Sequence, residues 1–394
     1  MDNNHIITTI APELGLRPEQ VTVNFSDEIY LDVPSTEFNR VCLAVHHKFK
    51  SPVMTFFAVD EVREGQAFKL YCAFAGFELR HWIFIKTAIP AATPEYATLS
   101  KDIYSANLFE REIKEMFGLN PVGNPDQRRL NLHDEVWPEG IFPLRKDFVQ
   151  PQSNSGKNEY LFKNIEGEGV FAVPVGPVHA GIIGPGHFRF SVAGEPIINL
   201  EMRLGFTHRG IEKILENHPP EECLGITEKI SGDAAFAYSW AFCSAIEKIN
   251  LISVPISAQY FRCLCLELER MYNHAADIGG IALDVGFSFP AAYASVIKES
   301  ILILNEELTG SRYSRGVVTL GGVTTDISEQ NIKELSDSLK SLTADFTEVL
   351  EISLDTTSMI NRLKGSGVLN KQVAIDHGVV GVAAKALGLA KDAR

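Results

Sequence analysis

A change in residue pattern near residue 150 is the feature that most constrains how this chain folds. The first part contains short apolar runs that are rich in β-branched and aromatic residues and are separated by breaks such as Glu64-Gly65. Such runs predict strands, which we place at residues 53–59, 67–74 and 81–87. The Ser, Asn, Gly and Pro residues of segment 151–158 favour coil. We therefore predict a linker there, between a domain of residues 1–150 and a domain of residues 159–394.

The first part also carries one well-marked helix. Ser105 stands where an N-cap belongs, Gly118 stands where a helix ends, and the residues between them repeat at helical spacing. The apolar side of this helix consists of Phe109, Ile113, Met116 and Phe117. Strands combined with such a helix indicate a small α/β domain.

The second part has a different pattern. Residues 169–178 and 186–200 predict short strands on either side of a loop rich in Gly and Pro. Long amphipathic patterns follow at residues 228–249, 256–278, 291–308 and 327–354. We therefore predict a mainly helical bundle with a small sheet at its start, which makes the fold class of the whole chain α+β.

Composition argues against several classes of protein. The net charge of −14 disfavours nucleic-acid binding through phosphate neutralisation. The N-terminal residues show no signal-peptide pattern, and no apolar run reaches the length of about 18 residues that a membrane span needs. The six cysteines form no CxxC pair, so we expect all six to be small buried thiols in a reducing compartment.

An ordered set of charged motifs lies in and after the predicted helix. It consists of Glu110-Arg111-Glu112, Asn124-Pro-Asp126 and Pro143-Leu-Arg145-Lys146-Asp147. This set resembles the signature of the 30-kDa subunit of respiratory complex I and its hydrogenase relatives. The resemblance implies a domain that braces its partner and carries no cofactor. We assign Glu110, Arg111, Asp126 and Arg145 to packing and interface ion pairs, for which the arginine–carboxylate fork is well suited.

A second set of motifs spans the rest of the chain. Its members are Gly176-Pro-Val-His179, His208-Arg209-Gly210-Ile-Glu212, Leu266-Glu-Leu-Glu269-Arg270 and Asn273-His274. The set resembles the 49-kDa subunit of complex I and the large subunit of group 4, energy-converting nickel–iron hydrogenases of the formate hydrogenlyase type. The order of the two sets in one chain resembles that of fused subunits of this kind.

The cysteines of a nickel–iron site are missing from this second set. Such a site needs four soft thiolate ligands, which in the resembled family come from two CxxC pairs. The positions of the first pair hold Ser231 and Ala234, and the chain ends at Arg394, before the second pair would come. Arg394 is therefore either a natural end or the end of a fragment. We predict that the chain binds no metal and has no classical hydrogenase activity.

The resemblance implies roles for residues near the missing site. Glu212 matches a carboxylate that relays protons beside the metal, although a glutamate in a first helical turn also suits the helix dipole. His208 and Arg209 match residues near the terminal iron–sulfur cluster of a partner subunit. Asp233 stands in the former metal pocket, where it can pair with Arg209 or Lys229 or take part in a proton or quinone site.

Two histidines flank the loop that is rich in Gly and Pro. The equivalent hairpin of complex I offers a histidine to the quinone headgroup, and a histidine that titrates near neutral pH suits a proton-coupled acceptor. The alternative for His179 and His187 is a loop histidine bonded to the backbone. We predict catalytic roles for Glu212, His208 and Asp233, and cofactor-binding roles for Arg209, His179 and His187.

Together these inferences predict a component of the large-subunit type in a membrane-bound, complex I-like oxidoreductase. It would shape the electron-acceptor cavity, with quinone as the candidate acceptor, and would bind no other cofactor directly. Its partners would be a small subunit that carries the iron–sulfur cluster and antiporter-like membrane subunits, with no nucleic acid. We expect a peripheral position on the cytoplasmic face of the inner membrane. The alternative is a structural or assembly subunit whose former active-site pocket is filled.

Overall fold

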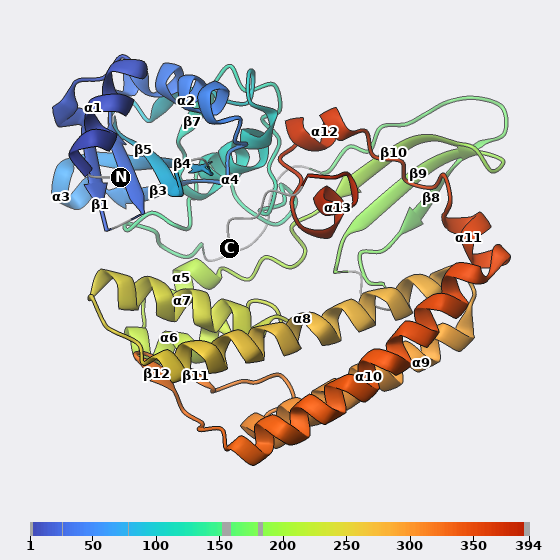
Figure 1. The fold of residues 1–394 in the computed structure, drawn as a ribbon. Helices are drawn as coiled ribbons and strands as arrows, with labels where there is room; N and C mark the ends of the chain where they lie inside the picture. The colour runs from blue at the N-terminus through green and yellow to red at the C-terminus, as the bar shows by residue number, and fades with distance from the viewer. Residues whose placement is uncertain (1–2, 26, 78, 152–158, 180–183, 390–394) are drawn as a thin grey trace. The chain divides into compact units, whose positions relative to one another are not determined.

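The computed structural model describes residues 3–25, 27–77, 79–151, 159–179 and 184–389 (Figure 1). The chain forms two compact units, each of which is described by itself. The first unit contains residues 1–177, 185–208 and 369–394, and the second contains residues 178–184 and 209–368. Apart from Pro151, the predicted linker lies outside the described residues.

A five-stranded sheet forms the centre of the first unit (Figure 1). Its order is β1 (Val21–Asn24), β2 (Glu28–Asp32), β5 (His81–Pro90), β4 (Ala67–Gly76) and β3 (Thr55–Glu61). Strands β2 and β5 run parallel, and the other neighbours run antiparallel. The sheet confirms the three strands predicted in this region, and strands β1 and β2 were not predicted.

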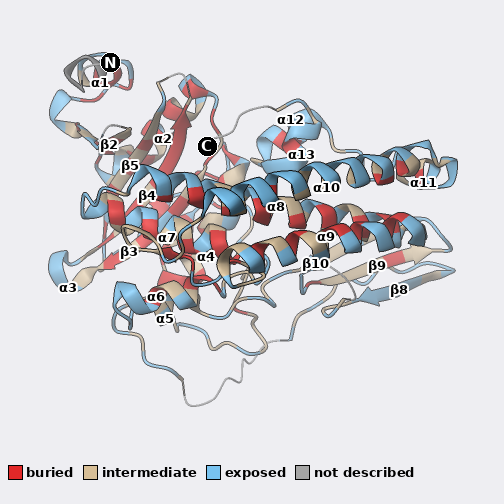
Figure 2. Cartoon of the chain, turned by 60° about the horizontal axis from the view of Figure 1, so that its bottom comes forward, coloured by how far each residue is buried: buried red, intermediate tan, exposed pale blue. Residues whose placement is uncertain are grey.

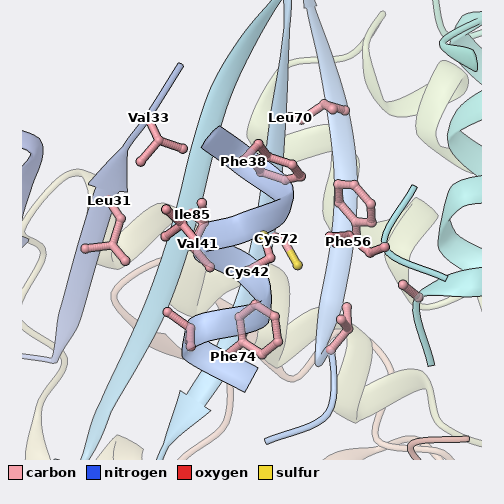
Figure 3. Packing of buried hydrophobic residues seen from close by; sticks show 14 of the residues in the cluster. Leu31, Val33, Phe38, Val41, Cys42, Phe56, Leu70, Cys72, Phe74 and Ile85 are labelled. Atoms are coloured by element: carbon pink, nitrogen blue, oxygen red, sulfur yellow. The ribbon is translucent and has the colours of Figure 1, made fainter. Parts of the chain in front are cut away.

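Helix α2 (Ser35–Phe49) covers one face of this sheet. Figure 3 shows the apolar side of α2 directed at the strands, with Phe38, Val41 and Cys42 facing Leu31, Phe56, Cys72 and Ile85. All of these side chains are buried, so their removal from water is a main source of the unit's stability. The shorter helices α1 (Asn3–Glu13), η1 (Pro18–Gln20) and α3 (Val62–Gly65) complete this part.

Helix α4 (Asn107–Phe117) carries the charged motif of the first unit. It ends at Gly118, whose φ of 72° gives the left-handed C-cap that the sequence predicted. The predicted N-cap role of Ser105 is wrong, because the turn η2 (Tyr104–Ala106) precedes the helix. The Ser105 hydroxyl instead accepts a hydrogen bond from the backbone N–H of Val53 at 3.2 Å. The short strands β6 (Glu95–Ala97) and β7 (Asn120–Val122) pair in parallel.

A three-stranded antiparallel sheet also belongs to the first unit. Its order is β10 (Ile197–Arg203), β9 (His187–Ala193) and β8 (Val170–Val175), which confirms the strands predicted after the linker. Helices α12 (Lys371–Asp376) and α13 (Gly381–Ala386) lie in the same unit. Beside α12, the ring of His377 lies 4.4 Å from the ring of Tyr104. Segments far apart in the sequence therefore build one unit.

Helices dominate the second unit. They are α5 (Ile211–Leu215), α6 (Pro220–Thr227), α7 (Ala235–Ile249), α8 (Ile256–Asp284), α9 (Ser288–Thr309), α10 (Glu329–Asp355) and α11 (Thr357–Leu363). A small hairpin of β11 (Val318–Thr319) and β12 (Gly322–Val323) lies between α9 and α10. The four long predicted helices are confirmed, but α7 begins at Ala235 and not at residue 228. Residues 228–234 form a loop instead.

The two longest neighbouring helices, α8 and α9, pack closely. A Cβ on Gly279 would lie 2.9 Å from the Cβ of Ala294, so the absence of a side chain at Gly279 permits this approach. Figure 2 shows buried residues in stripes along both helices, with exposed residues on the other side. This arrangement matches the amphipathic patterns in the sequence. The buried cluster includes Leu268, Tyr272, Ile297, Ile301 and Leu335.

The cysteines largely follow the sequence expectation. Five are buried, but Cys263 is exposed, so the prediction of six buried thiols is wrong at that position. Cys263 and Cys265 are two residues apart on α8 and therefore point to different sides of the helix. None of the helices in the described part of the chain has the length and apolar character needed to span a bilayer.

Candidate functional site

The loop of residues 228–234 contains the two positions where the resembled family carries its first cysteine pair. Side chains from elsewhere in the second unit bind its carbonyl groups. One guanidinium nitrogen of Arg209, Nη2, donates to the carbonyl oxygen of Lys229 at 2.7 Å and to that of Ile230 at 2.8 Å. Arg209 is therefore engaged with the backbone of this loop.

Helix α8 fixes the end of the same loop. The hydroxyl of Tyr272 donates to the carbonyl oxygen of Asp233 at 2.6 Å, and the amide of Asn273 donates to the same oxygen at 2.9 Å. Arg315 donates to the carbonyl oxygen of Gly232 at 3.3 Å. These contacts satisfy carbonyl groups that no helix can satisfy here, and they define the loop conformation.

Glu269 of α8 binds the first turn of α7. Its carboxylate accepts hydrogen bonds from the backbone N–H of Phe236 at 2.8 Å and of Ala237 at 3.1 Å. These are N-terminal donors that a helix cannot satisfy by itself. Glu269 is only 5% exposed. Burial raises the pKa of Glu269 to about 7, with a further contribution from the charge of Asp233, although the two backbone hydrogen bonds oppose the shift.

The side chains inside the loop form a small group of their own. Asp233 is exposed, and its carboxylate accepts a hydrogen bond from the hydroxyl of Ser231 at 2.5 Å. Pairing with Arg209 or Lys229, which the sequence left open, is not seen among the described contacts. The Ser231 hydroxyl is therefore occupied within the protein, and Ala234 offers no donor atom.

Glu212 lies in the first turn of α5, two residues after Gly210, the N-cap of that helix. Glu212 is exposed in the described unit. A carboxylate at this place is favoured by the partial positive charge of the helix N-terminus, which is the structural alternative raised by the sequence. Its proton-relay role stays a prediction.

The three candidate histidines are all half-buried. The ring of His187 donates through Nδ1 to the carbonyl oxygen of Gly176 at 3.3 Å and lies 5.4 Å from the ring of Phe162. This matches the alternative of a loop histidine bonded to the backbone. The backbone N–H of His208 donates to the carbonyl oxygen of Gly205 at 3.1 Å. His179 directly precedes residues 180–183, which lie outside the described residues.

The six candidate residues divide between the units. Arg209, Glu212, Asp233 and His179 belong to the second unit, and His187 and His208 belong to the first. Within the second unit, Arg209 and the loop that carries Asp233 are in direct contact. The roles predicted for the six remain predictions.

The residues of the 30-kDa-like motif have structural roles in the first unit. Arg111 pairs with Asp126 at 3.3 Å, as assigned. Arg145 donates to the carbonyl oxygen of Phe117 at 2.6 Å. Glu110 is fully buried and accepts hydrogen bonds from two hydroxyls, one backbone N–H and one amide at 2.5–2.7 Å. Glu110 therefore forms a buried hydrogen-bond network with neutral groups and not an ion pair.

The chain segment that leads to His208 is held by the loop of residues 128–135. Glu115 of α4 accepts hydrogen bonds from three consecutive backbone N–H groups in that loop, at 2.9–3.2 Å. Glu135 of the same loop binds Arg203 of β10 through two nitrogens, at 2.8 and 3.0 Å. The 30-kDa-like motif thus fixes the end of β10, five residues before His208.

Reasoning from the sequence missed Glu269, Tyr272 and Arg315, although Glu269 lies in a motif quoted above and Tyr272 lies beside one. A signal for Glu269 was present. The buried positions Cys265, Leu268 and Tyr272 define one face of α8, and Glu269 falls on that same face. A carboxylate on the apolar face of a helix indicates a buried titratable group.

The donor chemistry of the loop does not fit a nickel–iron group. Such a group requires thiolates, whereas no cysteine occurs between Cys223 and Cys243 in the sequence. The hydroxyl of Ser231 is a poor, hard substitute and is bonded to Asp233. In the part of the chain that the structure describes, no cluster of three or more His, Cys, Asp or Glu side chains is arranged to hold a metal ion.

Both parts of the chain match known protein families. Residues 31–154 match the 30 Kd subunit of respiratory-chain NADH dehydrogenase, and residues 284–394 match its 49 Kd subunit. The chain belongs to the fused 30-kDa and 49-kDa-type subunits that are related to the large subunits of group 4 hydrogenases. The confirmed α+β fold is consistent with this membership.

Individual relatives extend the comparison. Hydrogenase-4 component G of Escherichia coli is 34% identical over 91% of this chain and 64% of its own length. The fused C/D polypeptide of the NADH-quinone oxidoreductase of Phocaeicola vulgatus is 30% identical over 76% of this chain and 61% of its own length. The chain therefore spans less than two thirds of these relatives.

A solved structure shares the fold. A chain of the membrane-bound sulfane sulfur reductase, an archaeal respiratory membrane complex, matches 58% of this chain and 61% of its own length, with a TM-score of 0.55 and 25% identity. The relatives are thus components of membrane-bound hydrogenase and complex I-like complexes.

Proposed function

We propose that this chain is a component of the large-subunit type in a membrane-bound, complex I-like oxidoreductase, and that it works without a nickel–iron centre of its own. The observation that carries the proposal is the loop of residues 228–234. Its backbone is still bound by Arg209, Tyr272 and Asn273, whereas the two ligand positions hold Ser231 and Ala234. A loop that is held in place but has lost its thiolates supports a retained site with changed chemistry.

In this proposal the chain shapes the cavity where electrons reach an acceptor, and quinone is the proposed acceptor class. The iron–sulfur cluster belongs to a small partner subunit, and antiporter-like membrane subunits complete the complex. The chain attaches peripherally at the cytoplasmic face of the inner membrane. The relatives support quinone as an acceptor class and a position at a membrane, because one is named for quinone and another belongs to a respiratory membrane complex.

The chain's own residues would provide protons beside the acceptor. Glu269 is the favoured group, because a buried carboxyl with a pKa of about 7 is protonated and deprotonated in comparable amounts near neutral pH. Asp233 is exposed beside it and bonded to Ser231. Arg209 binds the carbonyl groups of Lys229 and Ile230 in the loop that carries Asp233, so it acts as a positioning residue.

The experiment is purification of the native complex through a tag on this chain, followed by metal analysis and by quinone-reductase and hydrogen-uptake assays. We expect iron but no stoichiometric nickel, quinone reduction, and no hydrogen uptake. Stoichiometric nickel in the intact complex would contradict the proposal. The same assays with sulfane sulfur as acceptor separate the two acceptor classes that the relatives' names contain.

A structural or assembly role is the second candidate. It is favoured by the hydrogen bonds of the loop, because the Ser231 hydroxyl and the bound carbonyl groups all have hydrogen-bond partners within the protein. A variant pair separates the two roles. Glu267→Gln, at an exposed position two residues away, is the control and should leave both assembly and electron transfer unchanged. If Glu269→Gln also leaves both unchanged, the scaffold role is correct.

A further inference from the structure

The face of α4 that carries the charged motif borders a cavity of about 270 Å³ in the first unit. Its lining includes Arg111, Lys114 and Glu115 of α4, together with Arg128 and Arg129 of the loop that follows. No part of the proposed redox function uses this cavity. A lysine and three arginines around one cavity raise the question of which positive charges already have partners.

The arginines are all paired with carboxylates. Asp126 binds Arg111 at 3.3 Å and accepts two bonds from Arg128 at 2.7 and 2.9 Å. Arg129 binds Asp134 at 3.1 Å. Two carboxylates thus serve three guanidinium groups, so each arginine at the cavity has a carboxylate partner although Asp126 is shared.

Glu115, the carboxylate of α4 at the cavity, is also engaged. It accepts the backbone N–H groups of Leu130, Asn131 and Leu132. Backbone N–H groups, and not a cation, therefore hold the Glu115 carboxylate in place. These hydrogen bonds use most of its capacity to accept.

Lys114 differs from these groups. Its ammonium donates to the amide oxygen of Gln127, a neutral acceptor, and no carboxylate pairs with it among the described residues. Burial lowers the pKa of Lys114, which is the expected effect when a cation loses water without gaining an opposite charge. A carboxylate that enters the cavity would restore the missing partner.

We propose that this cavity receives an aspartate or glutamate side chain of another subunit, which pairs with Lys114. Three carboxylates already line the cavity, namely Glu115, Asp134 and Glu139. They disfavour a doubly charged group such as phosphate and leave room for a single carboxylate. Leu108, which is 51% exposed, lies on the same face of α4 as Arg111 and Glu115. An acidic side chain beside an apolar one is therefore the matching feature of the partner.

This inference rests on the proposed role as a subunit of a complex. The test treats the purified native complex with a water-soluble carbodiimide, which joins a lysine amine to a carboxylate in contact with it, with loss of water. Mass spectrometry then identifies the linked peptides. We expect a link from Lys114 to an Asp or Glu of a different subunit. No link at Lys114, or a link only within this chain or to a second copy of it, would overturn the proposal.

Variants give an independent readout. Lys114→Gln removes the charge, Lys114→Arg keeps it, and Lys101→Gln alters an exposed lysine of the same unit. We expect Lys114→Gln to weaken binding of the linked subunit at least about tenfold in 0.15 M salt, as loss of a partly buried charge pair does. Lys114→Arg and Lys101→Gln should bind like the unaltered chain.

The outcomes separate this inference from the proposed function. If the tagged chain recovers no other subunits at all, the subunit role itself fails. If the complex is recovered but Lys114 forms no link and Lys114→Gln binds normally, the subunit role stands and the carboxylate site alone is wrong.

Discussion

Gly205 lies directly against the backbone of Leu130, so closely that a Cβ at Gly205 would be 2.6 Å from the carbonyl oxygen of Leu130. The same residue has a φ of +87°, which L-residues with side chains rarely adopt. Beside it, the ring of His133 donates through Nε2 to the carbonyl oxygen of Leu204 at 2.7 Å. The end of β10 is therefore pressed onto the loop that Glu115 holds.

This contact predicts that Gly205→Ala destabilises the first unit by about 2–4 kcal/mol, because backbone strain and a steric clash add together. Gly210→Ala is the matched control, since Gly210 also has a positive φ, of +64°, but has nothing within 4 Å of an added Cβ. The control should lose only about 1 kcal/mol. Urea unfolding measures both changes, and amide exchange at Leu130–Leu132 should rise in Gly205→Ala. Equal losses in the two variants would mean that the contact with Leu130 is absent.

A second prediction concerns the buried ion pair of Arg262 and Glu247. The two side chains bond through both carboxylate oxygens at 2.7 and 3.0 Å and are 2% and 6% exposed. Hydrogen bonds from Arg262 and from the Gly321 N–H lower the pKa of Glu247, although burial alone would raise it. We expect Arg262→Met to cost about 3–5 kcal/mol, because it leaves a buried carboxylate without its partner.

Arg270→Met on the same helix is the control for this pair. Arg270 binds Glu267 at 3.1 Å, but the two side chains are 32% and 58% exposed, so the loss should be at most about 1 kcal/mol. The double variant Arg262→Met with Glu247→Leu should recover much of the loss. A cost at Arg262 that equals the cost at Arg270 would show that the pair is not buried in solution.

The fold was predictable where the sequence signal is local and repeated. Strands β3, β4 and β5 and helices α8, α9 and α10 follow from apolar periodicity, which burial imposes directly. The start of α7 was not predictable in this way. Residues 228–234 continue the helical pattern, but Glu269, Tyr272 and Arg209, which are distant in sequence, bind the backbone in and directly after this segment and hold it as a loop. Such a contact has no local signal.

The candidate site likewise has features that single residues reveal and features that depend on contacts between distant residues. The sequence led to the prediction that Ser231 and Ala234 replace two thiolate ligands, because ligand chemistry is a property of single residues. It did not identify the partner of Asp233, since pairing depends on side-chain positions. From the family resemblance, Glu110 was assigned with three other charged residues to packing and interface ion pairs. The structure instead gives Glu110 four neutral donors in a buried network, which spacing alone cannot reveal.

A third prediction concerns the pH dependence of stability. The pKa of Glu269 is about 7 in the folded chain and 4.5 when unperturbed, so the folded state holds its proton more tightly. The contribution of Glu269 to the free energy of unfolding is fully present below pH 4.5. It falls by about 3 kcal/mol as the pH rises to about 7. Glu269→Gln should remove this slope. Fluorescence of Trp240, which lies 6.2 Å from Phe236 on α7, can report local unfolding in a variant without the other two tryptophans.

The control for the stability slope is Glu267→Gln, which changes an exposed carboxylate two residues away. It should leave the difference in unfolding free energy between pH 5 and pH 8 as in the unaltered chain. If Glu269→Gln retains the same slope as this control, the carboxyl of Glu269 titrates near its ordinary pKa and is not a candidate proton donor at neutral pH.

A fourth prediction carries the same group into function. If Glu269 supplies protons beside the acceptor, the rate of acceptor reduction by the assembled complex should change around pH 7, where this carboxyl titrates. In Glu269→Gln the rate should fall at least about tenfold, and its dependence between pH 6 and pH 8 should become flat, because an amide does not exchange protons in this range. A purely structural role would change the amount of complex but not the shape of the pH profile.

Tyr272→Phe provides the comparison, since it loosens the loop at Asp233 without removing a titrating carboxyl. It should lower the rate but keep a pH-dependent profile, moved toward higher pH, because the Tyr272 hydroxyl lowers the pKa of Glu269. A flat profile in both variants would place the effect in the loop and not in the proton of Glu269.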